Sequence, residues 1–175
     1  MVSISGYGII SGYTDNGQKK EEQTVPQYYE SLGFSYGSFN GTKPQSLSWD
    51  FSQFKPEAVV INLGTNDDSY CQSDSDKQQE YTDAYVEFLK KVREKNPDAK
   101  IFCTVGIMGG RIYTALEDAY IKYIKETGDE NVYVYKFDTQ NGAEDGYAAD
   151  WHPTEKTHQK SSEAFAAEMK SVMGW

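Results

Sequence analysis

The segment EAVVINLGTND, residues 57–67, decides the fold class of this 175-residue chain. It contains a run rich in β-branched residues that lies between Pro56 and Gly64. A short apolar run bounded in this way predicts a strand over residues 58–63 that is buried on both faces of a parallel sheet. The last letters of the segment, GTND, are polar and follow the strand at its carboxyl end.

The same reading extends along the chain. Apolar runs and helical spacing predict two further strands, AKIFCTVG (99–106) and NVYVYKF (131–137), and helices over residues 76–96, over 114–128 and from Pro153 onward. The second helix ends at Gly128, a favoured residue at helix C-termini. Because strands and helices alternate, the sequence predicts one α/β domain over residues 1–175, with a parallel sheet and right-handed crossovers.

The N-terminal third is less regular. MVSIS predicts a short strand over residues 2–5 that runs directly into the glycine-rich turn GYGIISG. TVPQYYESL (24–32) predicts a short helix with Thr24 as N-cap and Pro26 in its first turn. Residues 33–50 are rich in Gly, Ser, Asn and Pro and predict a long loop, a kind of segment that is often functional.

Composition narrows the class of protein. The net charge of −10, without a basic cluster, argues against binding to nucleic acid or to an anionic membrane surface. No apolar run approaches the roughly 18 residues of a membrane span, and the sequence MVSISGYGII is not a signal peptide. Cys71, in a predicted polar loop, and Cys103, in a predicted strand, match no zinc pattern, and we expect two unpaired thiols.

Three polar clusters fall at strand ends or before the last helix: SGYG (5–8), GTND (64–67) and DWHP (150–153). Each has a purely structural alternative, namely a tight turn, a helix cap and a histidine bonded to backbone. Ligands of an open parallel sheet bind outside the carboxyl ends of its strands. Because all three clusters converge there, they predict a binding or catalytic site.

Acyl transfer is the chemistry that needs such a set. A histidine can take the proton of a hydroxyl nucleophile, while a side-chain amide and a glycine N–H stabilise the oxyanion. The chain has only two histidines, His152 and His158, and both lie in AADWHPTEKTH, residues 148–158.

These motifs resemble those of the SGNH hydrolases, and within them carbohydrate esterase family 2, whose members deacetylate plant cell-wall polysaccharides. The resemblance rests on SGYGIISGY (5–13), WDFSQFKPEAVVINLGTND (49–67), PDAKIFCTVGIM (97–108) and DWHPTEKTH (150–158). It spans nearly the whole chain in the family's order. It implies a three-layer α/β/α sandwich with a flavodoxin-like parallel sheet, and it implies no metal or organic cofactor.

Site residues follow from this resemblance by motif. Gly8 would donate its N–H to the oxyanion, with Gly6 the less favoured candidate for that place. Asn66 would supply the oxyanion amide and His152 the general base. His158 is expected to be a structural residue of the last helix.

The resemblance also suggests where substrate binds. Trp151 and Trp49 are candidates to line the acyl or sugar pocket, with core packing as the equally weighted alternative. Asp67 and Gly6 are further candidates for contact with the substrate. The high aromatic content, with 14 Tyr, 8 Phe and 3 Trp, is compatible with a sugar ligand but also with ordinary core packing.

One departure from the family concerns the partner of the histidine. SGNH enzymes carry an aspartate three residues before it, and Ala149 stands in that position here. Asp150 is therefore the candidate carboxylate, and the Trp151 carbonyl is the candidate backbone substitute. A neutral acceptor stabilises the imidazolium less than a carboxylate does, yet it still fixes the tautomer.

The second departure concerns the nucleophile. The family's first block is a GDSIT-like turn that carries the serine, and VSISGYG lacks the Gly-Asp that would make Ser3 its equivalent. We therefore expect that the first strand of the family fold and its serine are missing. The strand at 2–5 would then pair directly with the strand at 58–63, or another chain would supply a strand.

The leading hypothesis is an SGNH-type serine esterase that removes acetyl groups from xylan or glucomannan, with impaired activity because the nucleophile block is missing. The alternative is a non-catalytic carbohydrate-binding module that retains the sugar cleft. A third reading is a fragment of a longer secreted enzyme. The full-length family member would be extracellular, whereas this chain has no signal peptide.

Overall fold

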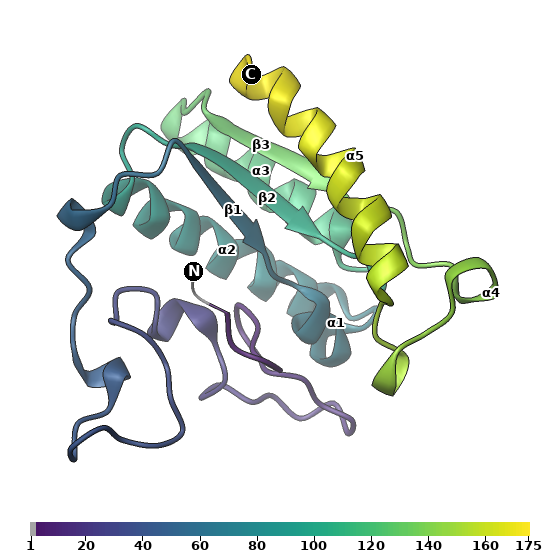
Figure 1. The fold of residues 1–175 in the computed structure, drawn as a ribbon, viewed down its shortest axis with the longest axis horizontal. Helices are drawn as coiled ribbons and strands as arrows, with labels where there is room; N and C mark the ends of the chain where they lie inside the picture. The colour runs from purple at the N-terminus through teal and green to yellow at the C-terminus, as the bar shows by residue number, and fades with distance from the viewer. Residues whose placement is uncertain (1–2) are drawn as a thin grey trace.

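The computed structural model describes residues 3–175 as a parallel sheet with helices on both faces (Figure 1). The regular elements are β1 (Ala58–Asn62), α1 (Thr65–Cys71), α2 (Ser75–Lys95), β2 (Lys100–Val105), α3 (Tyr113–Thr127), β3 (Val132–Lys136), α4 (Gly142–Asp145) and α5 (Glu155–Met173). Short 3-10 helices occur at Val25–Gln27, Pro44–Ser46, Phe51–Gln53 and Ala149–Trp151. The predicted α/β class is confirmed, and the strands and long helices lie within a residue or two of their predicted bounds.

The sheet of the described residues has three parallel strands in the order β1-β2-β3. Ala58 pairs with Lys100, and Ile101 pairs with Val132, so the chain returns to the same end of the sheet after each helix. All three strands therefore end at one edge of the sheet. The polar clusters that follow them are placed at this edge.

Two apolar layers enclose the central strand. Alternate residues of β2, Ile101 and Cys103 among them, pack with α2 and α3, which lie behind the sheet in Figure 1. Phe102 points to the opposite face and contacts Phe165 of α5 edge-on, with ring centroids 5.8 Å apart. Helices thus cover both faces of β2, as the predicted three-layer sandwich requires.

β1 differs from the prediction. Ile61 is buried, but Val60 is 45% exposed and Asn62 is also exposed, so burial on both faces is wrong for this strand. The reason is positional, because α5 packs over β2 and β3 and leaves the front of β1 open (Figure 1). Within the described chain, β1 pairs with β2 alone and its other edge carries no strand.

The N-terminal third departs most from the prediction. Residue 2 of the predicted strand lies outside the described part, and residues 3–5 form no strand and do not pair with β1. The expected move of this segment to β1 is therefore wrong for residues 3–5. The helix predicted over 24–32 shrinks to one 3-10 turn, where Thr24 makes no side-chain cap, while 33–50 is irregular as predicted apart from Pro44–Ser46.

Other local predictions have mixed outcomes. Gly128 ends α3 in the left-handed conformation, as predicted. Both cysteines are unpaired, as predicted, and both are buried, but Cys71 is the last residue of α1 rather than part of a loop. GTND follows β1 as predicted, and its last three residues are the first three residues of α1. Over residues 3–175, no helix has the length and apolar character that a membrane crossing requires.

Candidate functional site

The carboxylate of Asp67 fastens the glycine-rich turn to the start of α1. It is fully buried and accepts hydrogen bonds from the N–H groups of Ile9 (2.9 Å), Ile10 (2.7 Å) and Ser11 (3.1 Å). Burial raises the pKa of the Asp67 carboxyl, and these three N–H donors offset part of the rise. Asp67 was expected to contact substrate, but its burial assigns it to the turn instead.

Gly8 is needed for this close approach. A Cβ at Gly8 would lie 2.4 Å from Oδ2 of Asp67 and 2.2 Å from the Ser11 carbonyl oxygen, so no side chain fits. The N–H of Gly8 already donates to the carbonyl of Gln23, at 3.2 Å. The preferred candidate N–H for the oxyanion therefore already has a backbone acceptor in this structure, and its assignment to the oxyanion stays a prediction.

Gly6 has the opposite surroundings. It is half-buried with a positive φ of 78°, and a Cβ there would meet no atom within 4 Å. Its carbonyl accepts from Tyr13 N–H, whereas its own N–H has no acceptor among the described residues. Gly6, the less favoured candidate, is thus the glycine of the SGYG cluster with an N–H to offer.

Asn66 lies beside this turn. Its Nδ2 donates a 2.8 Å hydrogen bond to the carbonyl oxygen of Tyr7, the residue that follows Gly6. An amide nitrogen carries two hydrogens, so one remains for another acceptor. The structure therefore joins the SGYG and GTND clusters through Asn66, while Asp67 binds the residues that directly follow SGYG.

His152 is presented by a strained turn after α4. Asp150 (φ 51°) and Trp151 (φ 62°) are non-glycine residues in the left-handed conformation. The imidazole Nδ1 lies 3.0 Å from the carbonyl oxygen of Ala149. Because a carbonyl can only accept, the proton is assigned to Nδ1, and the lone pair is left on Nε2.

The acceptor of His152 differs from both candidates raised by the sequence. The Trp151 carbonyl accepts a 2.8 Å hydrogen bond from Nε2 of Gln140 instead. Asp150 makes no hydrogen bond or ion pair to His152 within the described chain, and its side chain is exposed. A backbone carbonyl does replace the carboxylate, but it belongs to Ala149.

The two tryptophans occupy different surroundings. Trp151 is 72% exposed and contacts Tyr147 edge-on, with centroids 5.2 Å apart, so core packing does not explain it. Trp49 is half-buried in the long loop, and its backbone N–H donates to the carbonyl of Glu30. Only Trp151 lies in the same turn as His152.

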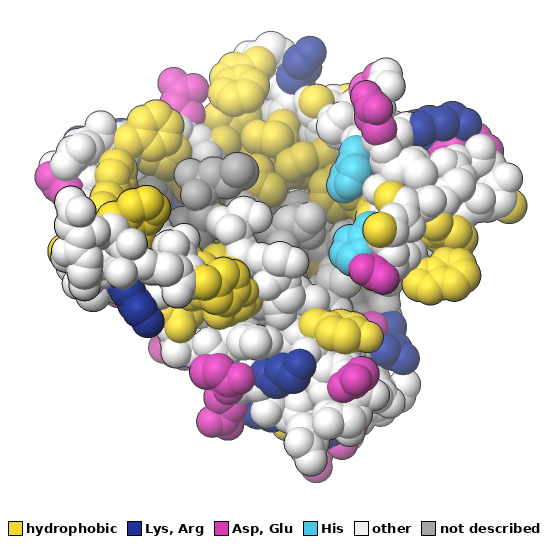
Figure 2. Space-filling view, turned by 60° about the horizontal axis from the view of Figure 1, so that its bottom comes forward, with side chains coloured by type: hydrophobic (Ala, Val, Ile, Leu, Met, Phe, Trp, Pro, Cys, Tyr) yellow, Lys and Arg dark blue, Asp and Glu magenta, His cyan; other side chains and the backbone are white. Residues whose placement is uncertain are grey.

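Both histidines lie on one face, beside a hollow in which hydrophobic side chains are visible (Figure 2). His158 lies in α5, as predicted, and its side chain is exposed. No hydrogen bond of the described residues joins His152 to Asn66 or Gly6. The structure therefore brings the three clusters to one edge of the sheet. SGYG and GTND form one hydrogen-bonded group there, and the turn that contains DWHP forms the other.

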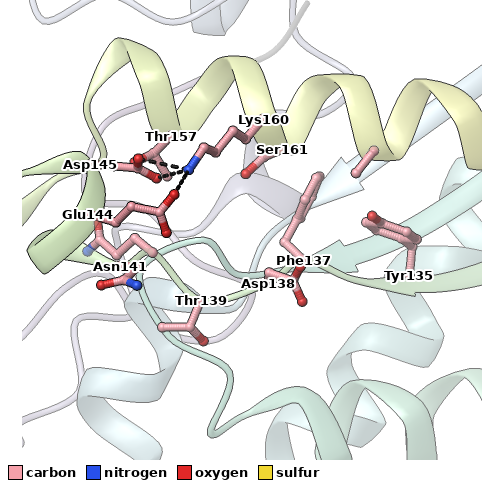
Figure 3. A pocket seen from close by; sticks show the side chains of 12 residues that line it. Tyr135, Phe137, Asp138, Thr139, Asn141, Glu144, Asp145, Thr157, Lys160 and Ser161 are labelled. Carbon is pink, nitrogen blue, oxygen red and sulfur yellow. Dashed lines mark hydrogen bonds and ion pairs between the residues drawn. The ribbon is translucent and has the colours of Figure 1, made fainter.

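A cavity of about 250 Å³ lies next to the His152 turn, between the end of β3, α4 and α5 (Figure 3). Tyr135 and Phe137 line it on one side, and Lys160 reaches from α5 to Glu144 (2.7 Å) and Asp145 (2.8 Å) on the other. None of the predicted site residues lines this cavity. Gln140 does, and it is the residue that connects the cavity wall to the turn.

Sequence reasoning missed two features of the site, namely Gln140 and the Ala149 carbonyl. It also missed the ion pair between Arg111 and Asp68 at the start of α1, in which Nε lies 2.8 Å from Oδ1. No local motif marks any of them. Among residues 3–175, no group of three His, Cys, Asp or Glu side chains is arranged to hold a metal ion.

Comparison with known proteins gives consistent results. The profile of the GDSL-like Lipase/Acylhydrolase family matches residues 9–160, which include Asn66 and His152. The chain is 35% identical to Cellulase/esterase CelE of Acetivibrio thermocellus and 27% identical to an Acetylxylan esterase / glucomannan deacetylase of Cellvibrio japonicus. Both alignments cover the whole of this chain, but they span only 20% and 44% of those two relatives.

Solved structures give the same picture. A family two carbohydrate esterase from Clostridium thermocellum, in complex with cellohexaose, has a TM-score of 0.73 and 34% identity. An acetyl xylan esterase (Est2A) from Butyrivibrio proteoclasticus has a TM-score of 0.84 at 22% identity, which supports the fold alone. Each match covers 97% of this chain and about half of the other, 48% and 50% respectively.

Proposed function

From the premise that this chain belongs to the GDSL-like lipase/acylhydrolase family, we propose that it forms the acyl-transfer site of an acetylesterase for plant cell-wall polysaccharide. Its relatives include esterases that act on acetylated polysaccharides, as their names state. In the proposed reaction a serine attacks the acetyl carbonyl, and His152 takes the proton of the serine hydroxyl. The ester C–O bond then breaks, and His152 gives that proton to the departing sugar oxygen, which leaves the acyl-serine and a neutral His152. Water then hydrolyses the acyl-serine with the same base.

The observation that carries the proposal is the hydrogen bond between Nδ1 of His152 and the Ala149 carbonyl. It leaves Nε2 of an exposed imidazole as the proton acceptor, which is the form that a general base requires. Nδ2 of Asn66 and the N–H of Gly6 are the proposed oxyanion donors. Trp151, exposed in the same turn, is the proposed contact for the sugar.

The serine is the part that the sequence does not supply by motif. The 175 residues contain no Gly-Asp-Ser, and Ser3 is exposed without the flanking residues of that block. Within residues 3–175 no strand pairs with the outer edge of β1, and this edge, beside the exposed side chain of Val60, offers a place for one more strand. We therefore propose that a nucleophile-bearing strand pairs with β1, and that the 175 residues alone turn over substrate weakly or not at all.

The test compares the chain with a strand-fused form, in which a strand carrying Gly-Asp-Ser is joined ahead of residue 1. With p-nitrophenyl acetate, the strand-fused form should hydrolyse ester and His152→Ala should abolish turnover. His158→Ala, which removes the other exposed histidine, is the matched control and should retain activity. Strong turnover by the chain alone that Ser3→Ala abolishes would contradict this proposal, because it would identify Ser3 as the nucleophile.

A second candidate function is carbohydrate binding without hydrolysis. The exposed Trp151 beside Tyr147 favours it, because flat aromatic side chains bind sugar rings. This candidate predicts saturable binding of the chain to xylan or glucomannan that is lost in Trp151→Ala. It also predicts that the strand-fused form releases no acetate, so the two candidates are distinguished by one assay.

A further inference from the structure

The backbone before His152 is held in an unfavourable shape. Asp150, with φ 51° and ψ 39°, and Trp151, with φ 62°, adopt the left-handed region that side chains other than glycine avoid. Such residues persist only where their surroundings fix them, and they concentrate at functional sites. Something outside this turn must therefore hold it.

Gln140 is the residue placed to do so. Its backbone N–H donates to the carbonyl of Ile107, at 2.7 Å, which fixes it to the segment after β2. Its side-chain Nε2 donates to the carbonyl of Trp151, at 2.8 Å, across 11 residues of chain. One residue thus ties the second strained position of the turn to the carboxyl edge of the sheet.

The oxygen of the Gln140 amide shows which atom of the side chain is useful in this position. Its Oε1 is buried and has no hydrogen-bond partner among the described residues. A buried polar atom without a partner is unfavourable, and an apolar side chain of similar length would avoid that penalty. The amide is useful here for the donor that it presents to Trp151.

The shape of this turn determines which ring nitrogen of His152 carries the proton. The Ala148 N–H donates to the His152 carbonyl at 2.8 Å, and the His152 N–H donates to the Ala149 carbonyl at 3.0 Å. The ring Nδ1 lies 3.0 Å from that same Ala149 oxygen. Opening the turn at Trp151 would move the oxygen that keeps the proton on Nδ1.

We propose that Gln140 is a positioning residue that keeps His152 in the Nδ1–H tautomer by holding the carbonyl of Trp151. This rests on the proposed role of His152 as general base, because that role needs a free lone pair on Nε2. Gln140 touches neither substrate nor the reacting atoms. It acts through the shape of the turn and through the Ala149 oxygen that accepts from the ring.

The experiment reads the tautomer directly in the protein as it exists. In the chain with ¹⁵N-labelled histidine, the two ring nitrogens are observed by NMR at about pH 8.5, above the ordinary imidazole pKa of about 6.5. His152→Ala assigns the signals. We expect wild-type His152 to show a protonated Nδ1 and an unprotonated Nε2, and Gln140→Met to shift both nitrogens toward a mixture of tautomers.

The controls separate positioning from general stability. His158 is observed in the same spectrum and should not change. Gln159→Met, which removes an exposed glutamine on α5, should leave His152 unchanged. Gln140→Met should also keep its urea unfolding midpoint, because it replaces an amide whose oxygen is buried without a partner. If Gln140 only stabilised the fold, Gln140→Met would lower the urea unfolding midpoint and leave the tautomer of His152 in the folded protein unchanged.

Unchanged ring nitrogens in folded Gln140→Met would overturn the proposal, as would a wild-type His152 protonated on Nε2. If Gln140→Met does not fold, Gln140→Glu is read in the same way, since its carboxylate repels the Trp151 carbonyl. The NMR measurement of the His152 ring nitrogens does not depend on ester hydrolysis. A shifted tautomer together with an inactive strand-fused form would leave this inference standing while the proposed function fails.

Discussion

The side-chain amide of Asn66 donates a 2.8 Å hydrogen bond to the carbonyl oxygen of Tyr7, a residue 59 positions earlier in the chain. This contact fixes one hydrogen of Nδ2 and directs the other away from Tyr7. The Tyr7–Gly8 peptide and the candidate oxyanion amide are thereby held in one arrangement. A single side chain thus serves both the geometry of the turn and the proposed chemistry.

Asn66→Asp should impair both roles, because it replaces a donor by a carboxylate that faces the Tyr7 carbonyl. We expect the free energy of unfolding to fall by about 1 to 3 kcal/mol. In the strand-fused form, the loss of one oxyanion donor should lower kcat by about 10² to 10³. Urea unfolding and p-nitrophenyl acetate kinetics measure the two effects. Full activity in Asn66→Asp would exclude the amide from the oxyanion site.

Asp67→Ala should be far more destabilising than a change at the adjacent Asp68. It leaves three buried N–H groups without an acceptor, which costs about 3 kcal/mol or more. Asp68→Ala is the matched control, because its ion pair with the half-exposed Arg111 contributes roughly 0 to 1 kcal/mol. Equal unfolding midpoints for the two variants would contradict the assigned role of Asp67.

Alanine substitutions at Gly8 and Gly6 should have contrasting effects. Gly8→Ala places a methyl group against the Asp67 carboxylate, so we expect a marked loss of stability. Gly6→Ala meets no neighbouring atom, and its positive φ costs only about 1 to 2 kcal/mol. Thermal unfolding of both variants tests the order, and a more stable Gly8→Ala would show that the turn packs differently.

The two thiols should be unreactive in the folded protein. Burial raises the pKa of Cys71 and of Cys103 to about 12, so the reactive thiolate is scarce near neutral pH. We expect iodoacetamide to label neither residue in the native chain and both in urea, as read by mass spectrometry. Rapid labelling of native Cys71 would show that the end of α1 opens readily.

The pair between Arg93 and Asp129 should make stability fall in acid. Burial raises the pKa of Asp129, but Nε of Arg93 (2.7 Å), the N–H of Asn131 and the hydroxyl of Tyr123 lower it by more, so the net shift is downward. A lowered pKa stabilises the fold fully above the ordinary Asp value of about 3.9. That stabilisation is lost as the pH falls through the folded value.

Asp129→Asn should therefore lower the free energy of unfolding by about 1 to 3 kcal/mol at pH near 7, with a smaller difference at pH near 3. Asp83→Asn removes the exposed pair with Lys122 and should change stability by roughly 0 to 1 kcal/mol. Urea unfolding at the two pH values gives both numbers. A difference that grows in acid would have the wrong sign for this mechanism.

Much of the fold could be predicted because its signals are local. β-branched runs, helical spacing and Gly128 gave the strands and long helices within a residue or two. The N-terminal third could not be predicted in this way. Its turn is held by Asp67, and no periodicity within residues 3–57 reports a hydrogen bond to a residue more than 50 positions away.

The sequence by itself determined the order of α/β elements, the family and the three polar clusters at the carboxyl edge of the sheet. Only the tertiary structure decided that Gly8 makes room for Asp67 while the Gly6 N–H has no acceptor among residues 3–175, and that Ala149 accepts from His152 while Gln140 holds Trp151. The physical reason is that strand and helix patterns repeat along the chain, whereas each of these hydrogen bonds depends on the position of one atom in the folded protein.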